Sequence, residues 1–120
     1  MKIFRIEHPS DGFGPYTTYH NYDDKGMRAA HCDQSSHPNP YVDLKLFYFE
    51  KSIHCGFNSQ ENLEKWFHGY LDNLNNNGFQ MVIYEGPAYK VSERTGQTLF
   101  DRGTSSLVKK INISELKTEE

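Results

Sequence analysis

The histidines and cysteines are the side chains of this chain with the widest chemical capacity. Six histidines occur in 120 residues, and two of them are followed directly by a cysteine, at His31-Cys32 and His54-Cys55. Zinc takes about four nitrogen or sulfur ligands in a tetrahedron, and two loops could bring together Cys32, His37, His54 and Cys55. The spacing is not that of a known zinc finger, and neighbouring residues of a strand point to opposite faces. We therefore predict no metal site.

A cysteine nucleophile is the second chemical possibility, because a nearby imidazole or helix N-terminus lowers the pKa of a thiol. Cys55 stands before Gly56-Phe57 and an expected helix start, but the two intervening residues weaken the effect of the helix dipole. Adjacency to His54 in the sequence does not supply the geometry of a catalytic pair. Nothing else in the chain indicates an oxidising compartment, so we predict that Cys32 and Cys55 are free thiols.

The opening segment carries Arg5, His8 and Tyr16 around a glycine-rich turn at residues 12–16. A strand over residues 2–8 leads directly into this turn, so the three side chains cannot lie far apart. The end of a strand beside a glycine turn can hold a phosphate or another anionic group.

The free amides of an expected helix start at Ser59 favour the same kind of anionic group. The alternative is that Arg5 and Glu7 form an ordinary ladder on the surface of the strand. If the anion site exists, replacing Arg5 and Tyr16 together is expected to abolish activity and to leave stability nearly unchanged.

A mainly antiparallel α+β fold is expected to position these residues. Apolar residues between 59 and 75 recur at helical spacing, which predicts one main amphipathic helix packed on the sheet, with Asn58 or Ser59 as its cap and Gly78 after its end. Alternating apolar residues bounded by turns predict the strands. They cover residues 2–8, 79–85, 89–92 and 97–101, with a hairpin turn at 93–96, a short tail strand at 108–113 and a further strand or hairpin within 41–54.

The length of 120 residues matches the usual size of one domain. We assign residues 1–114 to this domain and residues 115–120 to a charged, frayed tail. Residues 9–40 are rich in proline, glycine and polar side chains and lack periodicity, which predicts a long, ordered early loop. A loop of that length in a small domain is more often functional than decorative.

Charge and hydropathy argue against two classes of partner. Thirteen basic and sixteen acidic residues give a formal charge of −3, and no segment gathers the lysines and arginines that nucleic-acid phosphates require. The longest apolar stretch is far shorter than the roughly 20 residues that span a bilayer, and the start lacks the apolar region of a signal peptide. We expect neither nucleic acid nor a membrane as partner, and a cytoplasmic location.

Several short motifs are spread over residues 3–102. They are Arg5 and His8 in the opening strand, Gly14-Pro15-Tyr16, His37-Pro38-x-Pro40-x-x-Asp43, Gly56-Phe57-x-Ser59, Trp66-Phe67 and Gly96-Gln97-x-x-Phe100. In this combination the chain resembles a set of small proteins encoded by bacteriophages and prophages. The resemblance implies a viral accessory protein that acts in the cytoplasm of the bacterial host.

A weaker likeness is to ADP-ribosyltransferase folds, in which a first-strand arginine or histidine meets NAD and a late strand supplies a glutamine or glutamate. The matching positions are Arg5, Ser59 and Gln97. The chain departs from that pattern because Leu99 stands where a glutamate would follow Gln97 two residues later. The usual acidic partner of the transition state is therefore missing.

Two functions stay open at this point. The leading hypothesis is a non-enzymatic protein without a cofactor that binds and modulates or inhibits a host bacterial protein, such as a defence system. The alternative is an ADP-ribosyltransferase-like enzyme or a protein that binds NAD or another nucleotide. Convergence in space separates them, because residues that line one pocket favour the small ligand. The candidate ligand-binding or partner-binding residues are Arg5, His8, Tyr16, His37, Ser59 and Gln97.

Overall fold

One antiparallel sheet organises the computed structural model of this chain, which describes residues 1–16, 22–32, 37–38, 43–44 and 52–116. Within these residues the sheet has six strands in the order β4-β5-β2-β1-β3-β6. The strands are β1 (Lys2–Glu7), β2 (Ile53–Phe57), β3 (Gln80–Glu85), β4 (Ala88–Val91), β5 (Gln97–Asp101) and β6 (Ser106–Asn112). Every neighbouring pair runs antiparallel, which confirms the predicted sheet.

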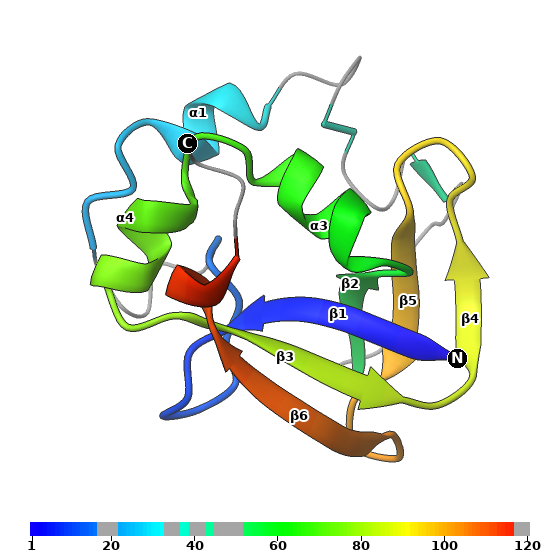
Figure 1. Cartoon of the computed structure of the whole chain (residues 1–120). Helices are drawn as coiled ribbons and strands as arrows, with labels where there is room; N and C mark the ends of the chain where they lie inside the picture. Colours follow the sequence, from blue (N-terminus) through cyan, green and yellow to red (C-terminus); the bar gives the residue numbers. More distant parts are fainter. Residues whose placement is uncertain (17–21, 33–36, 39–42, 45–51, 117–120) are drawn as a thin grey trace.

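Short helices cover one side of this sheet (Figure 1). They are α1 (Met27–Ala30), α3 (Gln60–Trp66), α4 (Leu71–Asn76) and the 3-10 turn η1 (Ile113–Glu115). Figure 1 shows α1, α3 and α4 on the same side, with the sheet below them. The fold class is therefore α+β, as predicted.

The single helix predicted over residues 59–75 is wrong in one respect, because the segment forms two helices. Ser59 caps α3 as expected, since its hydroxyl accepts a hydrogen bond from the amide of Asn62 at 3.1 Å. Between α3 and α4, Gly69 adopts a left-handed backbone with φ of 88°. A residue in that conformation cannot continue a right-handed helix. Apolar spacing did not reveal the break because both helices point their apolar residues into the same core.

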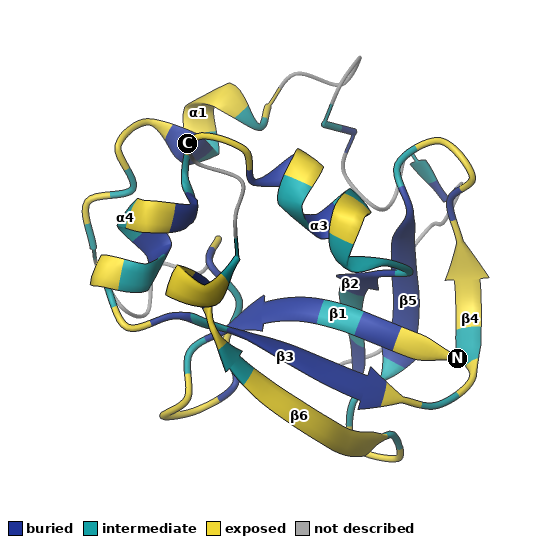
Figure 2. Ribbon diagram, viewed as in Figure 1, coloured by how far each residue is buried: buried dark blue, intermediate teal, exposed yellow. Residues whose placement is uncertain are grey.

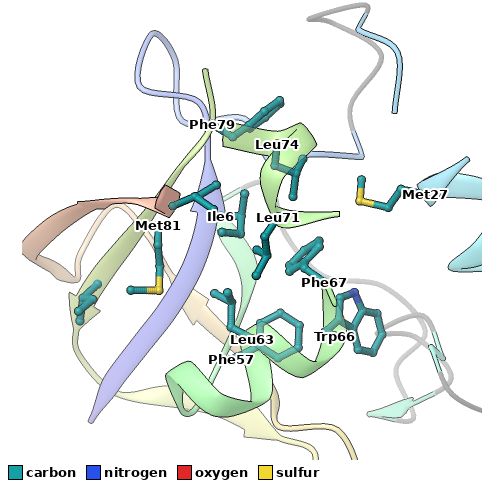
Figure 3. Packing of buried hydrophobic residues seen from close by; sticks show 12 residues of the cluster. Ile6, Met27, Phe57, Leu63, Trp66, Phe67, Leu71, Leu74, Phe79 and Met81 are labelled. Carbon is teal, nitrogen blue, oxygen red and sulfur yellow. The ribbon is translucent and has the colours of Figure 1, made fainter. Parts of the chain in front are cut away.

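That core fills the space between the helices and the sheet (Figure 3). Ile6 and Met81 come from the sheet, and Met27 comes from α1. The helical segment contributes its apolar face. Its buried members are Leu63, Trp66, Phe67, Leu71 and Leu74. Helix packing on this scale, and not the intrinsic stability of such short helices, holds α3 and α4 in place.

The sheet curls strongly and closes over a second, smaller core on its other face. Tyr84 of β3 and Phe100 of β5 are separated by two strands in the sheet, yet their ring centroids lie 5.3 Å apart. They are buried together with Ile3 and Val82. The curl brings the turn after β5 over the end of β1.

The two edge strands, β4 and β6, are largely exposed (Figure 2). Strand β4 has only four residues, and its pairing with β5 shifts register between Ala88 and Lys90. Strand β6 carries Lys109 and Lys110 and pairs irregularly with β3. Short strands, bulges and lysines are features that keep a sheet edge from pairing with another chain.

The predicted strands 2–8, 79–85, 89–92 and 97–101 are confirmed as β1, β3, β4 and β5, and the tail strand is β6. Gly96 takes the positive φ expected in the hairpin turn. Of the predicted strand or hairpin at 41–54, residues 41–42 and 45–51 lie outside the described residues, and Ile53 begins β2. The early loop contains α1, and parts of it, like residues 117–120 of the predicted tail, also lie outside the description. Among the described helices, none has the length and apolarity to cross a membrane.

Candidate functional site

A cavity of about 780 Å³ opens between the loop before α1, strands β1 and β2, and α3. Its wall is mainly aromatic. The rings that line it belong to Tyr16, His31, His37, Phe57, Trp66 and Phe67. Polar side chains also reach it, namely Arg5, Arg28, Cys32, Cys55 and Gln97. The volume falls within the range of about 300–1,000 Å³ that is usual for small-molecule sites.

Four of the six predicted site residues line this cavity: Arg5, Tyr16, His37 and Gln97. They come from β1, the early loop and β5, which are far apart in the sequence. His8 and Ser59 are not among the described residues that line it. The nitrogen Nδ1 of His8 lies 2.8 Å from the Ser10 hydroxyl, and Ser59 serves as the cap of α3. The structure thus places neither His8 nor Ser59 in the lining of this cavity.

Tyr16 is the centre of a hydrogen-bonded row in the cavity wall. The indole Nε1 of Trp66 donates to the Tyr16 hydroxyl at 2.6 Å, and that hydroxyl lies 2.5 Å from Nδ1 of His31. Burial raises the pKa of Tyr16 above its ordinary value, so the phenol keeps its proton and donates a hydrogen bond to Nδ1 of His31. Burial, followed by the proximity of His37, lowers the pKa of His31 to about 4. The His31 ring is therefore neutral at pH 7, with its proton on Nε2.

His37 extends the wall next to this row. Its ring stacks on His31, with centroids 4.1 Å apart and an angle of 15° between the planes. Nε2 of His37 lies 3.1 Å from the backbone oxygen of Trp66, which can only accept, so Nε2 carries a proton. The arrangement fixes the orientation of both imidazoles against α3.

The Arg5 side chain is buried, whereas a ladder on the surface of the strand would leave it exposed. Within the described residues, β1 and β2 pair in register at Phe4 and Phe57, and Arg5 lies directly after Phe4 in β1. There the Arg5 guanidinium donates to the carbonyl of Cys55 at 2.8 Å and to that of Gly12 at 3.2 Å. It also pairs with Glu7 at 3.0 Å. The Arg5–Glu7 pair exists, but it is buried, so the alternative of a surface ladder is corrected in that respect.

Glu7 is the hub of the charges behind the cavity. Its carboxylate also accepts from Arg102 at 3.1 Å and from the Tyr84 hydroxyl at 2.8 Å. Burial raises the pKa of Glu7, but the hydrogen bonds from Arg102 and Tyr84 and the charges of Arg5 and Arg102 outweigh burial and leave it below its ordinary value. Glu7 is therefore ionised at neutral pH and is the shared counter-charge of Arg5 and Arg102.

Gln97 connects the cavity to segments that are distant in the sequence. Its amide Nε2 donates to the carbonyl of Pro38 at 2.8 Å and to Asp43 at 2.7 Å. Its Oε1 lies 3.5 Å from the sulfur of Cys55. Burial raises the pKa of Cys55 to about 12, so this thiol stays protonated and acts as a weak donor. Gln97 thus holds residues 38 and 43 against β5.

Two of the described cavity groups, the Cys55 thiol and the His31 imidazole, are of the types that serve as nucleophile and base. The Cys55 thiol and the His31 imidazole are both uncharged at pH 7, so they do not form a thiolate–imidazolium pair. Both cysteines are free. Within the described part of the chain, no group of three histidine, cysteine or acidic side chains is placed to hold a metal ion.

Arg28, His31 and Trp66 also line the cavity, although they were not predicted as site residues. A signal for the first two exists, because Arg28, His31 and Cys32 are spaced as i, i+3 and i+4, which places them on one face of a helical turn. Trp66 was assigned to the core face of its helix, where it indeed lies. Its indole N–H nevertheless faces Tyr16 in the cavity.

Comparison with known proteins gives one clear relationship. The family described as Bacteriophage T4 Y00F protein matches residues 1–114. No curated protein and no solved structure matches the chain. The predicted resemblance to bacteriophage proteins is confirmed, and the chain belongs to the bacteriophage T4 Y00F protein family.

Proposed function

We propose that this phage protein is a non-enzymatic binding protein of the host cytoplasm, and that its aromatic cavity takes a flat ring of the ligand. The observation that carries the proposal is the convergence of Arg5, Tyr16, His37 and Gln97 on one cavity. These four belong to the six residues predicted to bind a ligand or partner, and they come together around aromatic rings. Aromatic walls favour flat rings, which stack on them or meet them edge to face.

Binding is favoured over the ADP-ribosyltransferase-like alternative by the positions of the residues that this alternative needs. The ADP-ribosyltransferase-like alternative needs Arg5, Ser59 and Gln97 around NAD, but Ser59 caps α3 away from the described cavity lining. The nitrogens of Arg5 donate to Glu7, Cys55 and Gly12. Arg5 therefore supports the cavity wall. Of the two parts of that alternative, an enzyme or a nucleotide-binding protein, the cavity favours nucleotide binding.

A second candidate function is the modulation or inhibition of a host bacterial protein, such as a defence system. It is favoured by Phe13 and Tyr16, two large aromatic side chains that are 43% and 42% exposed beside the cavity. Exposed aromatic residues next to a pocket are typical anchors of protein interfaces. In this case an aromatic side chain of the host protein would occupy the cavity in place of a small ligand.

Cys32 offers a way to test both candidates at the same cavity. It is exposed and lies in the lining, whereas the high pKa of Cys55 keeps that thiol unreactive. A bulky maleimide on Cys32 of the folded protein should block the entrance. Cys32→Ser protein treated with the same reagent is the matched control, because it cannot be labelled at that position.

The experiment incubates both proteins with small molecules from a bacterial extract and measures bound mass by native mass spectrometry. A parallel capture from bacterial lysate identifies bound proteins. We expect a ligand on the Cys32→Ser control and its loss from the labelled wild type. A host protein lost in the same way would favour the second candidate, and equal capture of any ligand or protein by both samples would refute the role of the cavity.

A further inference from the structure

A smaller pocket adjoins the cavity and differs from it in charge. It has a volume of about 200 Å³, and its described lining consists of His37, Asn62, Lys65, Trp66, Arg94 and Thr95. His37 and Trp66 line both spaces. They therefore form a common wall with an aromatic cavity on one side and a basic pocket on the other.

The basic pocket combines two cationic side chains with neutral hydrogen-bonding groups. Lys65 extends from α3 and Arg94 from the turn between β4 and β5, and no acidic side chain belongs to the described lining. Among the described residues, the carboxylate of Asp43 bonds to this lining, because it accepts from Thr95 at 2.6 Å; it also accepts from Gln97 at 2.7 Å. Its acceptor oxygens are thus directed at β5 and the turn before it.

We propose that the two spaces together bind a nucleoside phosphate, with the base in the aromatic cavity and the phosphate between Lys65 and Arg94. This inference rests on the proposed function of the cavity and names the class of its ligand. An aromatic wall next to two cations matches a molecule that carries a flat ring at one end and an anion at the other. The sugar lies against His37 and Trp66, which line both spaces.

The arginines of the larger cavity do not offer an equivalent anion site. The Arg5 guanidinium donates to Glu7, to the carbonyl of Cys55 and to that of Gly12, and Arg28 pairs with Asp24 at 3.3 Å. The donors of both arginines thus already have acceptors within the protein, whereas no described residue forms an ion pair with Lys65. The anion is therefore expected on the Lys65 side of the wall and the uncharged ring on the other side.

Trp66 provides a direct readout, because it is the one tryptophan of the chain and lines both spaces. The titration follows its fluorescence with the common nucleosides, their 5′-monophosphates, ribose 5-phosphate and inorganic phosphate. We expect at least one monophosphate to bind saturably and more tightly than its nucleoside. Ribose 5-phosphate and inorganic phosphate should bind far more weakly, since they lack the ring.

The decisive variant is the double substitution Lys65→Gln and Arg94→Gln. It should weaken the monophosphate about tenfold or more, since tenfold corresponds to about 1.4 kcal/mol, and should leave nucleoside affinity unchanged. Lys109→Gln with Lys110→Gln removes the same charge from exposed β6 and is the matched control. Circular dichroism checks that both variants fold.

Two outcomes overturn the inference in distinguishable ways. If a nucleoside binds as tightly as its monophosphate, or if the Lys65/Arg94 variant behaves like the β6 control, the phosphate site is wrong but the cavity remains a ligand site. If no nucleoside or nucleotide changes the Trp66 signal, the ligand class is wrong, and the capture experiment on Cys32-labelled protein decides separately whether the cavity binds anything.

Discussion

At the scale of single residues, the candidate site depends on side chains that hold one another in place. Tyr16 was predicted to be replaceable together with Arg5 without loss of stability. The structure revises this expectation, because Arg5 is buried in an ion pair and the Tyr16 hydroxyl connects Trp66 to His31. Arg5 and Tyr16 therefore have structural roles besides the function proposed for the cavity.

Tyr16→Phe tests the hydrogen-bonded row with little change of shape. The variant leaves the Trp66 N–H and Nδ1 of His31 without their shared partner. Because Tyr16 is 42% exposed, water can replace part of these hydrogen bonds, and we expect a loss of about 0.5–1.5 kcal/mol in urea unfolding, the net contribution of one hydrogen bond. Tyr89→Phe, at an exposed position of β4, is the control. A loss equal to that of the control would show that the row contributes nothing to stability.

At the scale of elements, the break between α3 and α4 determines how the cavity wall is placed. Trp66 ends α3, and the turn through Gly69 starts α4 in a new direction. A continuous helix over 59–75 would carry the same apolar residues along a single straight axis. The sequence pattern predicted which residues face the core, but the break depends on one glycine, whose backbone angle the pattern does not reveal.

Gly69→Ala should therefore destabilise the protein by about 1–2 kcal/mol, the usual cost of a left-handed backbone for a residue with a Cβ. A Cβ at this position would meet no atom within 4 Å, so the cost would be conformational and not a clash. Gly69→Asn should lose less, because asparagine tolerates this conformation better. Equal stability of the alanine variant and the wild type in thermal unfolding would mean that the turn rearranges.

The edge strands lead to a prediction about solubility. Lys109 and Lys110 lie on exposed β6 beside Leu107 and Val108, both 51% exposed. Replacing both lysines with valine extends an apolar edge and should promote association between chains. Light scattering over a concentration series should show growing particles for this variant only. Lys109→Gln with Lys110→Gln removes the same charge without adding apolar surface and is the control; association of that control to the same degree would show that the lost charge, and not the apolar edge, is responsible.

At the scale of the whole molecule, the sequence predicted the sheet well and the site in part. Alternating residues identified β1, β3, β4 and β5 because local periodicity reports which face is buried. Arg5, Tyr16, His37 and Gln97 were identified, but their meeting in one cavity depends on the curl of the sheet and on the path of the early loop, which no local pattern encodes. His8 and Ser59 were grouped with them on the basis of proximity in the chain, and they do not line this cavity.

The buried charges around Glu7 connect these distant parts of the molecule, and they predict its behaviour in acid. Glu7 of β1 binds Arg5, Arg102 after β5 and Tyr84 of β3. Its pKa is lower in the folded protein than its ordinary value of 4.5. The stability that this group contributes is therefore complete above about pH 4.5 and is lost as the pH falls through the lowered pKa of the folded state.

Glu7→Gln should remove this contribution and leave two arginines without their shared counter-charge. Breaking a buried ion pair from one side costs about 3–5 kcal/mol, so we expect a loss of that size near pH 7. The free energies of unfolding of variant and wild type should converge as the pH falls below about 4.5, because protonated Glu7 is also uncharged. Urea unfolding over a pH series measures both effects, with Glu93→Gln in the exposed hairpin turn as the control. A constant difference between Glu7→Gln and the wild type at every pH would show that the loss arises from packing and not from the charge of Glu7.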